Sequence, residues 1–218
     1  MNLTIISDIH GSYKNFPVDT LQPADALLIA GDITNTGSPA QVKKAKDWID
    51  TLKPVYKDIF YVFGNHDLGL GFRDFDSLGV TCVQDKVIEY EGLLIAGANL
   101  SVCYNLPILK KQWTHMTDNP KFEEAYYDTL PVCDILISHS PPAGKLGLSS
   151  SGEQCGSEKL LDYIKRVQPR LVVCGHIHEA AGAEYVGKTL VINTALRSYK
   201  IKGVDNWNIE LNRSQASR

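Results

Sequence analysis

The chain has 218 residues, of which 44% are hydrophobic and 22% charged, and its formal net charge is −3. This composition is close to the globular average, and the length suits one large domain or two small ones. The small negative charge disfavours nucleic acid or an anionic membrane as the main partner. No apolar run approaches the ~20 residues that cross a bilayer, and the N-terminus lacks a signal-peptide pattern. Five cysteines without a Cys-x-x-Cys motif favour a reducing, cytoplasmic setting.

The first predicted elements in chain order are buried strands at residues 3–7 and 25–30, because both are nearly continuous aliphatic runs. Residues 39–52 then carry apolar side chains at helical spacing after Pro39, and a third buried strand follows at 58–63. Short strands are predicted within 79–98, followed by a helix at 119–130 and a buried strand at 133–138. The last elements are a helix at 157–168, a strand at 171–174 and short strands over 180–211. The short strands of 79–98 and 180–211 are expected as antiparallel additions.

These elements predict one α/β domain over residues 1–211, with two sheets inside and helices outside. No internal repeat and no low-complexity linker interrupts the sequence. The last residues, 212–218, have the composition of a frayed tail.

Each of the five buried strands runs directly into polar residues that can bind metals. These strand-end motifs are Asp8-Ile9-His10, Gly31-Asp32, Gly64-Asn65-His66-Asp67, His139 and Gly175-His176-Ile177-His178. Because ligands of open α/β sheets bind outside the carboxyl ends of the strands, we expect these side chains at one rim. The set offers carboxylates, an amide and imidazoles but no thiolate, which suits Mn, Fe, Zn, Co or Ni.

No single motif in this set is specific, since Asp and Asn are common in turns. Together they are harder to explain, because five of the six histidines fall at these strand ends. At a background of roughly 0.03 per position, chance placement of five has a probability of ~10⁻⁸ before allowing for the choice of spacing. The seven candidate ligands are too many for one ion but suit two ions that share a carboxylate. The sixth histidine, His115, is expected to be a surface or packing residue.

The ordered motifs resemble the calcineurin-like metallophosphoesterases over residues 3 to about 195. The resemblance implies two mixed β-sheets packed as a sandwich flanked by helices, with a dinuclear metal centre. It implies one ion held by Asp8, His10, Asp32 and His178, and a second held by Asp32, Asn65, His139 and His176, with Asp32 bridging. His66 would lie beside the ions without binding them. Manganese is the expected metal, with Fe, Zn, Co and Ni as alternatives.

The charges of such a centre indicate hydrolysis of phosphoester bonds. Two divalent ions, two carboxylates and a bridging hydroxide leave about one positive charge, which attracts phosphate and stabilises a pentacovalent transition state. A bound metal lowers the pKa of water from 15.7 towards ~7, so a bridging hydroxide would be available for in-line attack. His66 is the candidate catalytic residue, as proton donor to the leaving oxygen. Asp67 either orients His66 or is a turn or helix-capping residue.

The expected substrate is a small or nucleotide-like phosphoester. No arginine lies near Asp32 in the second motif, and Asp67 stands where related protein phosphatases usually have glutamate. A phosphoprotein substrate is therefore disfavoured. Candidate substrate contacts are Asn65, His66 and Asn99, with Tyr104 and Lys145 as further loop residues near the rim. Two alternatives stay open. The first is a metal-dependent nuclease of the same superfamily, which the net charge disfavours, and the second is a non-catalytic scaffold with this fold.

Overall fold

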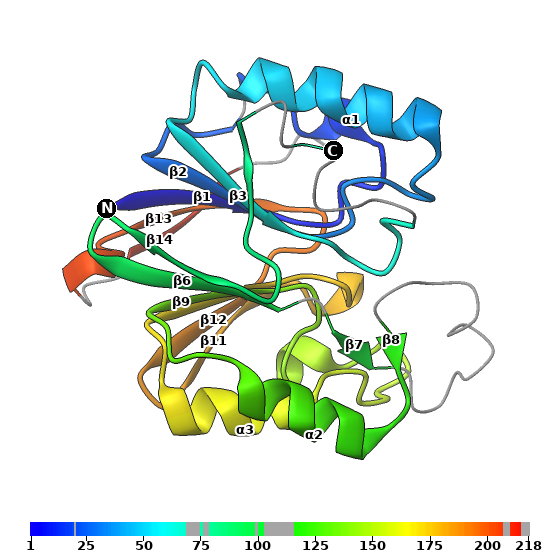
Figure 1. The fold of residues 1–218 in the computed structure, drawn as a ribbon, viewed down its shortest axis with the longest axis vertical. Helices are drawn as coiled ribbons and strands as arrows, with labels where there is room; N and C mark the ends of the chain where they lie inside the picture. The colour runs from blue at the N-terminus through cyan, green and yellow to red at the C-terminus, as the bar shows by residue number, and fades with distance from the viewer. Residues whose placement is uncertain are drawn as a thin grey trace.

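The computed structural model describes residues 1–19, 21–68, 75, 79–98, 100–102, 116–206 and 210–214. Two stacked β-sheets lie in the middle of the molecule, with helices on both outer sides (Figure 1). Helix α1 (Pro39–Leu52) covers one sheet, and α2 (Pro120–Thr129) and α3 (Glu158–Val167) cover the other. This arrangement confirms the predicted α/β fold with two mixed sheets flanked by helices.

The first sheet has the strand order β14-β13-β1-β2-β3-β4. Its parallel part consists of β1 (Asn2–Ile6), β2 (Ala26–Ala30), β3 (Asp58–Val62) and β4 (Thr81–Cys82). Strands β13 (Ser198–Lys202) and β14 (Glu210–Ser214) extend the sheet from β1 in antiparallel fashion. Because β1, β2 and β3 are parallel, the three loops that follow them meet at one edge.

The second sheet has the order β11-β12-β10-β9-β6-β5. Its parallel strands are β6 (Leu93–Ala98), β9 (Ile135–Ser138), β10 (Leu171–Cys174) and β12 (Thr189–Asn193). The antiparallel edges are β5 (Val87–Tyr90) and β11 (Gly182–Val186). A separate parallel pair is formed by β7 (Ser101–Val102) and β8 (Met116–Thr117). Short 3₁₀ helices lie at Tyr13–Asn15, Lys145–Gly147, His178–Ala180 and Val204–Asn206.

Pairing corrects two of the predictions from sequence. Strands β5, β11, β13 and β14 are antiparallel additions, as predicted. Strand β4 instead pairs in parallel with β3, and β6 and β12 pair in parallel with β9 and β10 on one side. A glycine turn fixes the direction of the two strands that it joins but not the neighbour on their other side. Strand β14 continues to Ser214, where Ser214 faces Ser198, so the predicted tail over 212–218 begins three residues too early. Residues 215–218 lie outside the described part of the chain.

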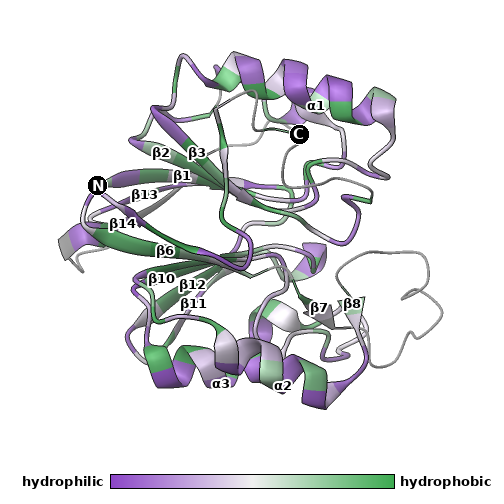
Figure 2. Cartoon of the chain, in the orientation of Figure 1, coloured by the Kyte–Doolittle hydropathy of each residue, from purple (hydrophilic) through white to green (hydrophobic). Residues whose placement is uncertain are grey.

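The inner strands of both sheets are buried on both faces, and alternate side chains belong to different apolar layers. Leu3 and Ile5 of β1 point into the layer between the two sheets, together with Ile135 of β9. The outer face of the first sheet packs on α1, and the outer face of the second packs on α2 and α3. Figure 2 shows hydrophobic strands in the middle and helices that are hydrophilic on their outer sides. Burial on both faces explains the nearly continuous aliphatic runs in the sequence.

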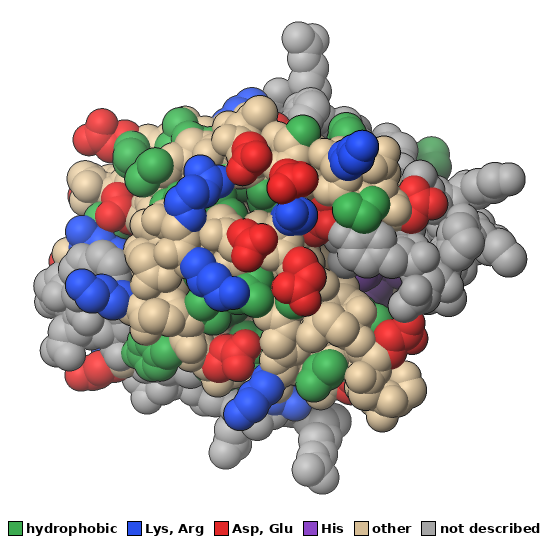
Figure 3. Space-filling view, turned by 90° about the horizontal axis from the view of Figure 1, so that it is seen from below, with side chains coloured by type: hydrophobic (Ala, Val, Ile, Leu, Met, Phe, Trp, Pro, Cys, Tyr) green, Lys and Arg blue, Asp and Glu red, His purple; other side chains and the backbone are tan. Residues whose placement is uncertain are grey.

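The outer face of α2 and α3 carries side chains of both charges side by side (Figure 3). Lys159 Nζ lies 3.0 Å from Glu124 Oε1, and Arg166 Nη2 lies 3.5 Å from Asp128 Oδ1, so ion pairs join the two helices. Such exposed pairs add little to stability, and the face shows no single-sign patch for a nucleic acid. No described helix has the length and apolar character needed to cross a membrane.

Candidate metal centre

Four candidate ligands have left-handed backbone conformations, which non-glycine residues seldom adopt. The φ angle is 58° at Asp8, 48° at His10, 53° at Asp32 and 71° at His176. These residues follow β1, β2 and β10, so four of the eight described non-glycine residues with positive φ lie in the loops at one rim of the two sheets. Strained backbone of this kind is typical of functional sites, because the surrounding structure must hold it in place.

Glycines in these loops make room for the carboxylates as well as allowing turns. A Cβ atom on Gly64 would overlap the carboxylate of Asp32, and one on Gly175 would overlap the side chains of Ser7 and Asp8. The sequence shows that Gly64 and Gly175 precede polar residues but gives no reason for a glycine there. The structure adds that the backbone passes directly against the two acidic side chains, where no other residue fits.

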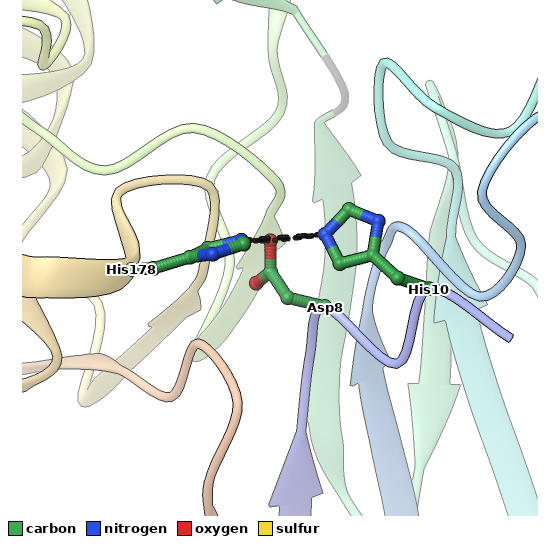
Figure 4. A group of neighbouring side chains, drawn as sticks. All are labelled: Asp8, His10 and His178. Atoms are coloured by element: carbon green, nitrogen blue, oxygen red, sulfur yellow. Dashed lines mark hydrogen bonds and ion pairs between the residues drawn. The ribbon is translucent and has the colours of Figure 1, made fainter. Parts of the chain in front are cut away.

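The carboxylate of Asp8 is fully buried and lies between the rings of His10 and His178 (Figure 4). Asp8 Oδ1 is 3.1 Å from His178 Nε2 and 3.7 Å from His10 Nε2, and the two Nε2 atoms are 3.3 Å apart. The Ser7 hydroxyl donates to Asp8 Oδ2 at 2.6 Å, and the His176 N–H donates to Oδ2 at 3.1 Å. Two imidazole nitrogens and a carboxylate oxygen therefore face one another at the end of β1.

The carboxylate of Asp32 lies at the end of β2 and contacts groups from three other loops. Its Oδ2 is 3.3 Å from His139 Nε2 and 3.6 Å from His10 Nε2, and its Oδ1 accepts the N–H of His66 at 2.8 Å. Asn65 Oδ1 is 3.0 Å from His139 Nε2. Both oxygens of Asp32 are thus turned towards the residues that the motifs predicted.

A backbone carbonyl sets the orientation of the His139 ring. His139 Nδ1 lies 2.8 Å from the carbonyl oxygen of Ala30, and a carbonyl only accepts, so Nδ1 carries a proton. The other nitrogen, Nε2, is then turned towards Asp32 and Asn65. Metal-binding histidines are commonly held in this way, with the second ring nitrogen donating to a carbonyl or carboxylate. Sequence reasoning missed Ala30 and Ser7, since a carbonyl and a single serine give no sequence signal.

Three groups of potential metal ligands overlap at this rim. They are Asp8, His10 and His178; His10, Asp32 and His66; and Asp8, Asp32 and His139, with all ligand atoms in a group within 4.8 Å of one another. Among the described residues, these groups do not include His176, whose ring centroid lies 5.0 Å from that of His139. His66 belongs to the second of these groups, and its ring centroid lies 4.7 Å from that of His10.

The buried carboxylates make this rim attractive to cations. Burial by itself raises the pKa of Asp8, but hydrogen bonds with His10 and His178 outweigh it and hold the pKa well below its usual value. Burial also lowers the pKa of His139, but the charges of Asp32 and Asp8 outweigh that and raise it to about 9. The carboxylates therefore hold a proton on His139 at neutral pH, and a divalent cation would benefit from the same negative charges. The donor set, of carboxylate oxygens and imidazole nitrogens, fits a divalent transition metal.

His66 is oriented by a backbone carbonyl, while Asp67 serves the turn. His66 Nδ1 lies 3.1 Å from the carbonyl oxygen of Asn35, so Nδ1 is the donor. The carboxylate of Asp67 accepts the N–H of Thr34 at 2.8 Å and the N–H of Gly64 at 3.0 Å. Of the two roles left open for Asp67, the turn role agrees with these contacts. Burial and the charge of Asp32 raise the pKa of Asp67 to about 6.

The sequence singled out four further residues outside the motifs. Asn99, Tyr104 and His115 lie outside the described residues. Lys145 begins a 3₁₀ helix in the loop after His139. That loop is attached to the rim where the Ser150 N–H donates to Glu179 Oε1 at 2.8 Å, next to His178.

Comparison with known proteins decides the family. The family model described as calcineurin-like phosphoesterase matches residues 1–180, which contain every strand-end motif. The chain belongs to this family. Membership confirms the resemblance seen in the sequence and, at the level of the family, the prediction of a phosphoester hydrolase.

Three curated relatives are 24% to 28% identical to this chain over the aligned residues. A UPF0046 protein of Caenorhabditis elegans is 28% identical, over 89% of this chain and 69% of the relative. Metallophosphoesterase domain-containing protein 1 of Homo sapiens is 28% identical, over 88% of this chain and 64% of the relative. A protein of Mycobacterium tuberculosis named cAMP/cGMP dual specificity phosphodiesterase is 24% identical, over 78% of this chain and 54% of the relative. The chain thus spans between about half and two thirds of the length of these relatives.

A solved structure supports the fold independently. The crystal structure of TT1561 from Thermus thermophilus superposes with a TM-score of 0.66 at 14% identity, covering 98% of this chain and 99% of the other. At that identity the similarity concerns the arrangement of the two sheets and their helices only.

Proposed function

We propose that this chain hydrolyses a small or nucleotide-like phosphoester at a centre for two divalent metal ions. The observation that carries the proposal is the overlap of the ligand groups, because Asp8, His10 and Asp32 each belong to two of the three. Two ions of like charge repel strongly at short distance, so a site for both needs anionic ligands between them. Asp32 Oδ2 lies near His10 of one ligand set and near His139 of the other, which suits a bridging ligand.

The proposed ligands divide into two sets that share Asp32. One ion would be held by Asp8, His10, Asp32 and His178, and the other by Asp32, Asn65, His139 and His176. The contacts of Asp8 with His10 and His178 support the first set, and those of His139 with Asp32 and Asn65 support the second. Mixed oxygen and nitrogen ligation favours manganese, with Fe, Zn, Co and Ni as alternatives. Burial lowers the pKa of His176 to about 4, so its ring is neutral at pH 7 and keeps a free nitrogen.

Divalent ions at this rim would supply positive charge for the phosphate oxygens and water of lowered pKa for the attack. The protein's own groups hold and orient the participants. The Ala30 carbonyl fixes the His139 ring, and Ser7 fixes the Asp8 carboxylate. His66 donates its Nδ1–H to the Asn35 carbonyl, and the protonated ring would give its Nε2–H to the leaving oxygen, which leaves a neutral ring with its proton on Nδ1.

A nucleotide-like substrate is supported by the name of one relative. The cAMP/cGMP phosphodiesterase is 24% identical over 78% of this chain, so cyclic nucleotides belong among the first substrates to test. The second motif has no arginine close to Asp32, which agrees with a small ester better than with a phosphoprotein. The cytoplasmic location expected from the cysteine content stays a prediction.

The test is a panel of metals against substrates. Protein stripped by chelation would receive Mn, Fe, Zn, Co or Ni and be assayed on bis(4-nitrophenyl) phosphate, 4-nitrophenyl phosphate, cyclic nucleotides and single-stranded DNA. We expect hydrolysis of small diesters only after a metal is returned, and close to two metal equivalents per chain by elemental analysis. Full turnover in the stripped protein would contradict the proposal, and a preference for DNA would favour the nuclease alternative.

A further inference from the structure

The loop between β2 and α1 carries the backbone carbonyl that orients His66, and its peptide groups are fixed from both sides. On the inner side, the Asp67 carboxylate accepts the N–H and the hydroxyl of Thr34 at 2.8 and 3.0 Å. The same Thr34 hydroxyl accepts the N–H of Gly37 at 3.1 Å. The segment that contains the Asn35 carbonyl is therefore anchored at its beginning and its end.

On the outer side, the loop is held by Gln41 from the first turns of α1. Gln41 Oε1 accepts the N–H of Asn35 at 3.0 Å and the N–H of Thr36 at 2.8 Å. The residue at the N-cap position, Ser38, makes no side-chain hydrogen bond to the helix. One oxygen of Gln41 thus receives two consecutive backbone amides of the loop.

The geometry of the peptide bond connects Gln41 to His66. The carbonyl of Asn35 and the N–H of Thr36 belong to the same peptide group, and none of the described peptide bonds is cis. In a planar trans peptide, the C=O and the N–H point in opposite directions. Binding of the Thr36 N–H by Gln41 on one side therefore turns the Asn35 carbonyl towards His66 Nδ1 on the other side, at 3.1 Å.

We infer that Gln41 is a positioning residue for proton transfer by His66. It holds the 35–36 peptide group so that the Asn35 carbonyl accepts the Nδ1–H of His66. The protonated ring then gives its Nε2–H to the leaving oxygen, and the ring is left neutral with its proton on Nδ1. This inference rests on the proposed function, in which His66 protonates that oxygen. If Gln41 were only a helix cap, it would affect the stability of α1 but neither the tautomer of His66 nor the leaving-group dependence of the rate.

Three variants separate these two roles. Gln41→Ala removes the acceptor, Gln41→Glu keeps an acceptor oxygen at the same position, and Lys44→Ala changes an exposed residue of the same helix. In single-turnover assays with saturating metal, we expect Gln41→Ala to slow hydrolysis of an ester with a poor leaving group by roughly 10-fold, a part of the usual effect of a general acid. The effect on 4-nitrophenyl esters should be smaller, with KM and metal content unchanged. Gln41→Glu and Lys44→Ala should behave like the wild type.

A spectroscopic measurement reads the position of the proton directly. In zinc-loaded protein at a pH where the His66 ring is neutral, its ring ¹⁵N shifts should show protonation at Nδ1 in the wild type, Gln41→Glu and Lys44→Ala. In Gln41→Ala they should move towards a mixture of the two tautomers. An unchanged tautomer in Gln41→Ala would overturn the inference, whatever its effect on the rate.

The same experiments keep this inference separate from the proposed function. If His66→Ala slows good and poor leaving groups equally, the proton-donor role fails, and the ring shifts still decide whether Gln41 positions His66. If His66→Ala shows the expected leaving-group dependence but Gln41→Ala does not, the proposed function stands and the role of Gln41 is wrong. Equal losses in Gln41→Ala and Gln41→Glu would also overturn it, because the acceptor oxygen is retained in only one of them.

Discussion

Asp32 Oδ2 lies 3.6 Å from His10 Nε2 and 3.3 Å from His139 Nε2, so the Asp32 carboxylate is close to one residue of each proposed ligand set. Replacing Asp32 by Asn keeps the size of the side chain but removes its charge. At 4 Å and an effective dielectric constant of ~20, two divalent ions repel by an upper bound of about 16 kcal/mol, which is four times the value of ~4 for unit charges. We expect Asp32→Asn to lose at least one metal equivalent and more activity than any other single ligand variant. Elemental analysis and turnover near wild-type values would show that Asp32 does not bridge.

His66 is predicted to behave differently from the proposed ligands. His66→Ala should keep both metal ions, because the ring is assigned to proton transfer. Its rate should fall by roughly 10²–10⁴ on esters with a poor leaving group and by less on nitrophenyl esters, as expected for a general acid. Single-turnover rates and metal content check this, with His139→Ala as the control that should lose metal. Loss of metal from His66→Ala would make His66 a ligand, in line with its position next to His10 and Asp32.

Metal affinity should depend on pH through His139. The carboxylates of Asp32 and Asp8 overcome the effect of burial and raise the pKa of His139 to about 9 in the metal-free protein. Below that pH a metal must displace a proton from Nε2, so affinity should rise by about tenfold per pH unit between pH 7 and 9. Chelator competition measures the affinity, and calorimetry in buffers of different ionisation enthalpy measures the released proton. A constant affinity with no proton release would show that His139 is not a ligand.

At the scale of single elements, the loop after β3 depends on Gly64. A Cβ on this residue would overlap the Asp32 carboxylate, so Gly64→Ala must displace either the loop or Asp32. Overpacking of this kind typically costs about 1–3 kcal/mol of stability. We expect a lower Tm, weaker metal binding and roughly 100-fold slower turnover, within the range associated with small misplacements in active sites. The control is Gly182→Ala, whose Cβ would lie 3.6 Å from Leu146, an ordinary contact. Similar behaviour of the two variants would contradict the close approach to Asp32.

The helices and buried strands are the elements that sequence patterns predicted best. The helix predicted at 39–52 is confirmed at both ends, and those at 119–130 and 157–168 differ by one residue at each end. The starts of these helices are marked by local residues, namely Pro39 in the first turn of α1 and the N-caps Asn119 and Ser157 of α2 and α3. The sequence alone can therefore show where each helix begins. The parallel pairing of β4, β6 and β12 with β3, β9 and β10 was not predicted, because pairing depends on which distant strand lies alongside.

At the scale of the whole molecule, the proposed ligands come from both sheets. Asp8, Asp32 and Asn65 follow strands of the first sheet, and His139 and His176 follow strands of the second. Metal ions at this rim would therefore join the two layers. A metal at 100 times its dissociation constant stabilises the folded state by about 2.7 kcal/mol, which corresponds to a Tm increase of roughly 5–11 °C for a domain of this size.

Thermal unfolding with and without chelator measures this stabilisation. The increase should be smaller in Asp32→Asn, which provides the matched control. If the wild type unfolds at the same temperature with and without metal, a centre shared by the two sheets is contradicted.

The sequence by itself determined the class of fold and the set of residues at the rim. Buried strands followed by Asp, Asn and His are local patterns, and the parallel direction of the strands brings their ends together. Tertiary structure alone decided how these residues are oriented. The Ala30 carbonyl turns His139, the Asn35 carbonyl turns His66, and Gln41 fixes the peptide group of Asn35. Backbone groups are the same in every residue, so their part in a site becomes visible only when the distant segments that they contact have folded next to them.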